Sequence, residues 1–525
     1  MKLIVVEKPS VAKTIRKYLD SEYEIVAISG HIRETRYERG ICKNPWKKVA
    51  LSTLVKTPLE LVPTTQNTAK AGYLRLKRAL AKNYDEIILA LDPDVQGYTM
   101  SHDIWQLLSK DVAIFTADLE ALDRAGVCRA MAEKTSYQDR GVSGDVKRRV
   151  DFLIGTIMTR CVSLKNQMAN SKWFTYTVGR VQSIALKFIR DRLEEHEKFV
   201  PELKKRLWLD DIKLPWFESE GPKSVDLRVI EKKEKKVGPF PGYNTDSLVS
   251  TLSRHPTFTQ NPTRIVKELE KLYLRGEISY PRTDNPDYSN YRDLLYAGSR
   301  IFEAQTGNKP IIPFLRPKKL SDHGPITILR GHNSEDSLQA KTIKQVLLKR
   351  CSQIYSGSNE YQVSTLEISN PIYGTTTHDL WISLIKRFED NRTSYPTMPV
   401  FSNEMLVKEE WTRPPFRYNF GSLIQKMASE GIGTKSTRSK IIETLVSRRY
   451  IYSIRGAPYV LTYYARRLLE ELANSFVLNS KFTQELEKSS EGVCREKMLE
   501  VEQRYRKNLE DFLKTYLKGV EQSWS

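Results

Sequence analysis

Short apolar runs alternate with amphipathic stretches along residues 1–145. The runs read as buried strands, at 3–6, 24–29, 86–91 and 112–116. Between them the apolar residues recur with the spacing of helices, and one such helix, at 10–19, is opened by the pair Pro9-Ser10. Strands that alternate with helices are typical of βαβ units. The pattern therefore predicts an α/β domain at 1–145 with a mainly parallel sheet.

The remaining chain changes character four more times. Helical periodicity over 146–197 gives way to short alternating runs at 198–240, and helical character returns over 241–359. Residues 360–412 again have β character, and 413–525 are helical. This order predicts a multidomain α/β plus α and β protein whose chain leaves two domains and later returns to them. The predicted domains are 1–145, 146–197 with 413–525, 198–240 with 360–412, and 241–359.

Charge adds a class of partner to this picture. The 525 residues include 84 Lys and Arg against 64 Asp and Glu, a formal net charge of +20, and the basic residues are spread along the chain. A broad basic surface favours a polyanion, and nucleic acid is the leading candidate. Some of the 26 Tyr and 8 Trp residues would be available to stack on unpaired bases. The alternative is a protein that is merely basic.

Cysteine usage and hydropathy exclude several classes. The five cysteines are far apart and form no C-x-x-C pair, so neither a zinc site nor a disulfide framework is expected, which suits a reducing compartment. The chain starts on the strand-like segment 2–6 without a signal peptide, and no apolar run approaches the roughly 20 residues of a membrane span. We expect no membrane association and a cytoplasmic, nucleoid-associated location, or a nuclear one in a eukaryote.

The segment 276–284 carries the most specific chemistry. A Tyr280 hydroxyl is able to attack a phosphodiester and to hold the cut strand as a phosphotyrosine. Arg282 points to the same side of an extended backbone and would clamp the phosphate oxygens, with Thr283 and Asp284 next to it. The alternative is an amphipathic edge strand with a surface salt bridge. His323, one of seven histidines, would donate a hydrogen bond to the same phosphate, although a lone histidine is more often structural.

Acidic residues follow two of the predicted strands. Glu7 and Lys8 come after the first strand, and Asp92 and Asp94 come after the run at 86–91. Ligands of open α/β sheets bind at the carboxyl ends of the strands. Carboxylates there suit Mg²⁺, with Glu7, Asp92 and Asp94 as its ligands, while Lys8 would hold a phosphate. A capped helix start and an Asp-Pro-Asp turn are the structural alternatives.

Two loops before helices have the residues of a phosphate-binding element. Gly179 permits close approach of a backbone, and Arg180, Gln182 and Ser183 open the helix that follows. A second loop, at 431–438, combines glycines, hydroxyl residues and two cations, which together fit the backbone of a nucleic-acid strand. The candidate binding residues of this loop are Lys435, Ser436 and Thr437. Ordinary glycine turns before capped helices would have the same residue types.

The order of these motifs resembles that of the type IA DNA topoisomerases, from residue 1 to about 515. The order is strand–Glu-Lys-Pro-Ser, Asp-x-Asp, Gly-Arg-Val-Gln-Ser, Tyr-x-Arg-Thr-Asp, a later His and Gly-Ile-Gly-x-x-Ser-Thr. Further matches are Gly30-His31-Ile32, Arg148-x-x-Asp151-x-x-x-Gly155 and Phe482-Thr483-x-x-x-Glu487.

The resemblance implies a Toprim domain at 1–145 within a torus of four domains. One half of the active site would hold Glu7, Lys8, Asp92 and Asp94, and the other half Tyr280, Arg282 and His323. Elements that bind single strands would include Arg180, Gln182, Ser183, Thr283 and Asp284 together with Lys435, Ser436 and Thr437.

The sequence departs from the family pattern at the acidic motif. The Toprim motif usually reads Asp-x-Asp-Arg-Glu-Gly-Glu, whereas here it reads Asp92-Pro93-Asp94-Val95-Gln96-Gly97-Tyr98. Two acids and one arginine are missing. Because Gln96 and Tyr98 bring no charge, we expect Mg²⁺ to bind more weakly or with altered geometry. The sequence also lacks the cysteine-rich zinc modules that many relatives carry.

The resemblance implies an enzyme that cuts one DNA strand through a 5′-phosphotyrosine, passes a strand and religates without ATP, and no P-loop motif is present. It would relax negative supercoils or decatenate, as a monomer on DNA with single-stranded character. RNA and a helicase partner stay open. One alternative is a degenerate relative that clamps single strands. Another is a Toprim primase or nuclease, which would need no Tyr280 segment.

Overall fold

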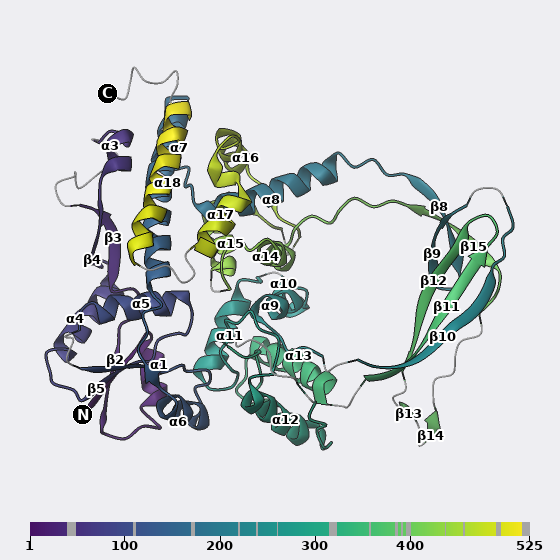
Figure 1. Ribbon diagram of the computed structural model, residues 1–525, viewed down its shortest axis with the longest axis horizontal. Coiled ribbons are helices and arrows are strands. Elements are labelled where there is room, and N and C mark those ends of the chain that lie inside the picture. The colour runs from purple at the N-terminus through teal and green to yellow at the C-terminus, as the bar shows by residue number, and fades with distance from the viewer. Residues whose placement is uncertain are drawn as a thin grey trace.

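A computed structural model describes most of the chain. The described residues are 1–38, 49–108, 112–169, 174–218, 221–237, 240–259, 261–313, 315, 323–355, 359–383, 387–389, 392–394, 401–435, 437–454, 457–489 and 495–516. They form a ring, with helices and one sheet gathered in a body on one side and a β-rich arch on the other (Figure 1). No helix among these residues is long and apolar enough to cross a lipid bilayer.

The N-terminal part contains a five-stranded sheet in the order β2-β1-β5-β6-β7. Its strands are β1 (Lys2–Val6), β2 (Tyr23–Ala27), β5 (Glu86–Leu89), β6 (Ala113–Thr116) and β7 (Thr135–Ser136). All pair in parallel except β7. The mainly parallel α/β sheet predicted from the sequence is therefore confirmed.

Helices cover both faces of this sheet, which explains the continuous apolar runs of its strands. Along β1, Leu3 and Val5 join one core cluster while Ile4 and Val6 join the other. The helices are α1 (Pro9–Ile15), α4 (Asn67–Ala79), α5 (Val95–Trp105) and α6 (Arg124–Ala132). An antiparallel hairpin of β3 (Arg33–Tyr37) and β4 (Leu59–Pro63), with α3 (Leu51–Lys56) between its strands, was not foreseen from the sequence.

A helical unit combines residues far apart in the sequence. Helices α7 (Val142–Ala169) and α8 (Arg180–Glu197) pack against the helices of the C-terminal part. These are α14 (Phe420–Ser429), α15 (Arg438–Ser447), α16 (Tyr463–Glu471), α17 (Ser480–Ser489) and α18 (Arg495–Tyr516), with the 3₁₀ turn Phe476–Leu478 and the short hairpin of β16 (Ile451–Tyr452) and β17 (Val460–Leu461). The yellow helix α18 lies along α7 in Figure 1.

The arch is also built by two passes of the chain. Strands β8 (Leu203–Leu209) and β9 (Ile212–Phe217) share a sheet with the much later β15 (Met405–Trp411). Strand β10 (Asp226–Val237) likewise pairs with β11 (Asn359–Asn370), which continues into β12 (Gly374–Ser383). A small hairpin links β13 (Arg387–Glu389) to β14 (Arg392–Ser394). All of these pairings are antiparallel.

The segment that carries Tyr280 belongs to a third group of helices. They are α9 (Thr245–Ser253), α10 (Pro256–Thr259), α11 (Arg264–Leu274), α12 (Arg292–Thr306) and α13 (Leu338–Tyr355). The segment around Tyr280 belongs to no strand of a sheet, and its only β-type pairing among the described residues is an isolated bridge from Ile278 to Ile328. The Tyr280 amide instead donates to the carbonyl of Glu120, across the boundary to the N-terminal unit.

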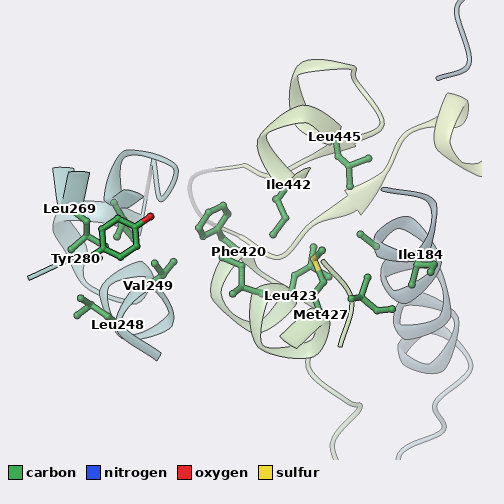
Figure 2. Close-up of a cluster of buried hydrophobic side chains, with 14 of the residues drawn as sticks. Ile184, Leu248, Val249, Leu269, Tyr280, Phe420, Leu423, Met427, Ile442 and Leu445 are labelled. Atoms are coloured by element: carbon green, nitrogen blue, oxygen red, sulfur yellow. The ribbon is translucent and has the colours of Figure 1, made fainter. Parts of the chain in front are cut away.

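The ring closes where α9 meets α14. Leu248 and Val249 of α9 lie on the same side as Tyr280, opposite Phe420 and Leu423 of α14 (Figure 2). The approach is very close: a Cβ atom on Gly421 would lie 2.4 Å from Ser253 Oγ and 3.0 Å from Ser250 Cα. This contact unites residues of the tyrosine-bearing group with the helical unit.

Candidate active site

The first half of the site lies at the carboxyl edge of the sheet. Because β1 and β5 are adjacent and parallel, the residues that follow them meet: Lys8 Nζ lies 3.2 Å from Asp92 Oδ2. Asp94 caps α5 by accepting hydrogen bonds from the amides of Gln96 at 2.9 Å and Gly97 at 3.0 Å. A Cβ atom on Gly97 would lie 1.7 Å from the Asp92 carbonyl oxygen, so only glycine fits there.

Tyr280 reaches this edge from the other side of the interface. Its side chain is buried, and its hydroxyl donates to Asp94 Oδ2 at 3.4 Å. Its ring packs against Tyr273 at 5.3 Å and against His323 at 4.8 Å between centroids. The structure thus brings the tyrosine and the acidic motif together, although 186 residues separate Tyr280 from Asp94 along the chain.

Burial and neighbouring charges set the pKa of the Tyr280 phenol. Burial raises the pKa of its phenol well above the usual value, the charges of Asp92 and Asp94 raise it further, and Arg282 opposes them without overcoming them. In this closed arrangement the low dielectric and the two carboxylates dominate, so the phenol keeps its proton.

The pKa of Glu7 is raised as well. Burial first, and then the charge of Asp92, raise the pKa of Glu7 from 4.5 to about 7. Lys8 and Arg282 act against this shift but do not cancel it. A carboxyl group with such a pKa exchanges its proton near neutrality, which suits a general acid or base.

Two cations are shared among the acids. Arg282 Nη1 lies 3.6 Å from both Asp92 Oδ2 and Asp94 Oδ2. Glu270 of α11, which no motif singled out, lies 2.5 Å from Lys8 Nζ and 3.9 Å from Arg282 Nη2. Its only sequence signal was a place in an amphipathic helix ten residues before Tyr280, which does not distinguish it from any solvated glutamate.

His323 and the residues after Arg282 support the same pocket. The His323 side chain is 1% exposed, and its Nε2 donates to the carbonyl oxygen of Pro93 between the two aspartates. The Thr283 amide donates to Thr245 Oγ1 at 2.8 Å, and Thr283 is buried. Asp284, the next residue, is exposed. His323 therefore lies in the site, and Thr283 anchors the chain that leads out of it.

Two residues in the first turn of α8, Arg180 and Ser183, have less access than a DNA contact requires. Arg180 is 3% exposed and lies 3.1 Å from Asp151 and 3.0 Å from Glu487. Those two acids belong to motifs that the sequence had singled out separately, and the ion pairs join α7, α8 and α17. Ser183 is buried as well, whereas Gln182 is partly exposed and accepts a hydrogen bond from Arg448 at 2.8 Å. Gln182 is the one of the three with a reachable side chain.

The turn before α15 lies beside the tyrosine segment. Lys435 is partly exposed, and Thr437 Oγ1 accepts from the Thr434 amide at 2.9 Å. Ser436 falls outside the described residues. Arg438, at the start of α15, reaches Asp246 at 2.5 Å and Asp284 at 3.6 Å. These ion pairs tie the turn to the tyrosine-bearing group.

Comparison with known proteins identifies the family. The family model described as DNA topoisomerase matches residues 136–208 and 216–502, and the Toprim domain model matches residues 2–122. The chain belongs to the type IA DNA topoisomerases. This topoisomerase is 26% identical to DNA topoisomerase 1 of Mycoplasmoides gallisepticum, with 94% of this chain and 80% of the relative aligned. It is also 26% identical to DNA topoisomerase 1 of Archaeoglobus fulgidus, with 94% and 81% aligned.

A solved structure has the same fold. Full-length topoisomerase I from Thermotoga maritima superposes with a TM-score of 0.65 at 21% identity, over 100% of this chain and 90% of that one. The ring of Figure 1 is therefore the toroidal arrangement of a type IA topoisomerase, with the Toprim domain at the N-terminus.

The Toprim domain is the metal-binding domain of topoisomerases, and its donors here suit Mg²⁺ in kind. Glu7, Asp92 and Asp94 offer hard oxygen atoms, and burial first and the charge of Asp92 second raise the pKa of Glu7. In the closed arrangement, however, Lys8 and Arg282 lie against these acids. Among the described residues no three histidine, cysteine or acidic side chains are grouped to hold a metal ion.

Proposed function

We propose that this topoisomerase cuts one DNA strand with Tyr280 and reseals it without ATP. The observation that carries the proposal is the contact of the Tyr280 hydroxyl with Asp94, made between the tyrosine-bearing group of helices and the Toprim sheet. Because the nucleophile lies at the boundary between them, the cut strand would stay attached to one unit while the other unit moves away, and this movement would open a gate in the ring. A second strand then passes through the opened ring.

The covalent step replaces one phosphate ester bond with another. The Tyr280 oxygen forms a bond to phosphorus, the bond from phosphorus to the 3′-oxygen breaks, and the cut strand stays attached as a 5′-phosphotyrosine. The phenol proton leaves toward Asp94, which already accepts its hydrogen bond. Glu7, protonated near neutrality, gives its proton to the leaving 3′-oxygen. Religation reverses these steps and therefore needs no ATP.

The remaining residues stabilise charge. Arg282 and Lys8 are cations within reach of Tyr280 and the acids, where incoming phosphate oxygens would compete with the carboxylates for them. His323 would exchange its Pro93 carbonyl partner for a phosphate oxygen. Mg²⁺ held by Asp92 and Asp94, and by Glu7 in its ionised form, would supply charge stabilisation at the phosphate.

We assign the substrate as DNA with single-stranded character. The enzyme would act as a monomer that relaxes or decatenates this DNA, at the nucleoid or, in a eukaryote, in the nucleus. Gln182, Lys435, Ser436, Thr437 and Asp284 form the strand-binding path of the proposal. Arg180, Ser183 and Thr283 act behind that path by holding its helices and turns in place.

The domains of the proposal follow the two passes of the chain. They are Toprim at 1–145, a helical domain at 146–197 and 413–525, the arch at 198–240 and 360–412, and the tyrosine domain at 241–359. The strand pairings of the arch and the packing of α7 on α18 support these groupings.

The test uses negatively supercoiled plasmid and a single-stranded oligonucleotide with Mg²⁺. Tyr280→Phe should lose both relaxation and the covalent adduct that is trapped by rapid denaturation. The matched control is Tyr273→Phe, which removes a neighbouring buried hydroxyl that donates to the Leu119 carbonyl at 2.6 Å. Wild-type relaxation by Tyr280→Phe would refute the assignment.

A further inference from the structure

Glu270 links the two halves of the site. It projects from α11 in the tyrosine domain, yet its closest contact is the Toprim residue Lys8, at 2.5 Å between Oε1 and Nζ. The same oxygen lies 3.9 Å from Arg282 Nη2. The side chain is 31% exposed, so it is neither a buried structural acid nor a fully solvated one.

The contact with Lys8 competes with another. Lys8 also lies 3.2 Å from Asp92, and Arg282 lies 3.6 Å from Asp92 and Asp94. Two cations are thus shared among three carboxylates. Each cation that Glu270 draws toward itself leaves Asp92 and Asp94 with more uncompensated negative charge, which is what a divalent cation requires.

The acidic motif of this chain is short of such charge. Gln96 and Tyr98 stand where the family motif has acids. Arg140 Cζ lies 5.6 Å from the centroid of the Tyr98 ring. Gln96 lies on the first turn of α5, next to the cap that Asp94 makes. Neither residue supplies a negative charge to the edge of the sheet.

We propose that Glu270 takes over the electrostatic part of the acids missing at 96 and 98. It acts as a positioning residue: it holds Lys8 and Arg282 so that Asp92 and Asp94 stay available to Mg²⁺. The proposal rests on the function proposed above. Because Glu270 belongs to the tyrosine domain, the full charge of the site is assembled only when the ring is closed, and opening the ring weakens the hold on Mg²⁺.

The experiment measures the Mg²⁺ dissociation constant of the full chain by calorimetry and, separately, the Mg²⁺ concentration at half-maximal adduct formation. Glu270→Gln should raise both by about tenfold, the size seen when a residue that supports metal ligands is removed. Adding Gln96→Glu to this variant should restore both to within about threefold. The matched control is Glu268→Gln on the same helix, where the Glu268 carboxylate pairs with Lys271 at 2.8 Å.

The outcomes separate the two proposals. An unchanged Mg²⁺ affinity in Glu270→Gln overturns the role of Glu270, and so does failure of Gln96→Glu to restore it in a variant whose thermal unfolding in chelator matches wild type. Tyr280→Phe should bind Mg²⁺ like wild type while forming no adduct. If Tyr280→Phe still forms the adduct, the proposed function fails, and the calorimetry still decides the role of Glu270.

Discussion

Glu7 shows how one residue connects the site to stability. Its carboxyl group is placed among other acids by the end of β1, and burial and Asp92 raise its pKa to about 7. Between pH 4.5 and 7 the folded protein keeps a proton that the unfolded chain has released. The contribution of Glu7 to the free energy of unfolding therefore falls as the pH rises through this window, and it stays low above the window.

Glu7→Gln should remove this dependence. The melting temperature of the variant relative to wild type should rise between pH 4.5 and 7 and then level off, as thermal denaturation across that range will show. Glu22→Gln, a change at a more exposed carboxylate, is the control. A difference from wild type that is constant with pH would contradict the assignment of the raised pKa to Glu7.

The glycine of the acidic motif, Gly97, is required by a close contact with the backbone. It lets the first turn of α5 press against the Asp92 carbonyl while Asp94 caps the helix. A single added methyl group must push the helix away from the acidic motif.

Gly97→Ala should therefore lower stability by roughly 2 kcal/mol through overpacking and should also weaken adduct formation. Chemical denaturation and the oligonucleotide assay measure the two effects. Gly155→Ala is the control, because a Cβ atom there meets nothing closer than 3.8 Å and alanine favours the helix α7. Equal behaviour of the two variants would count against the close approach.

At the scale of elements, a buried ion cluster supports the tyrosine segment. Lys344 of α13 is fully buried and lies 2.8 Å from both Glu277 and Asp336. Arg275 lies 3.0 Å from Glu277, at the turn where Gly276 adopts a φ of 68°. The cluster thus connects α13 to the turn between α11 and Tyr280.

Lys344→Met should destabilise the protein by about 3–5 kcal/mol, because it leaves two buried carboxylates with only the half-exposed Arg275 as a cation partner. Urea denaturation measures the loss. Lys341→Met, on an exposed position of the same helix, should cost far less. Similar losses in both variants would mean that the cluster does not hold the segment.

At the scale of the whole molecule, catalysis requires the ring to open and close. Closure depends on the contact of α9 with α14 and on the contacts of the tyrosine segment with the Toprim domain. Cleavage needs only the closed ring, whereas strand passage needs both states. The two activities should therefore be separable by a covalent lock.

Cysteines at 253 and 421 provide such a lock, since a Gly421 side chain would point at Ser253. The oxidised Ser253→Cys, Gly421→Cys protein should still form the adduct with an oligonucleotide but should not relax plasmid. Reduction of the disulfide should restore relaxation. The two single variants and oxidised wild type, which has the exposed Cys128, are the controls. Relaxation by the fully oxidised protein would place the gate elsewhere.

The sequence by itself determined the alternation of strands and helices, the two passes of the chain and the family, and it singled out Tyr280 as the proposed nucleophile. These follow from local periodicity and from short motifs whose residue types are tied to their chemistry. Only the tertiary structure decided that Arg180 is buried in ion pairs, that Tyr280 is held protonated, and that Glu270 stands at the site. Burial and pairing depend on distant segments, such as α11 against α1 and α8 against α17, and these contacts leave no trace in local spacing.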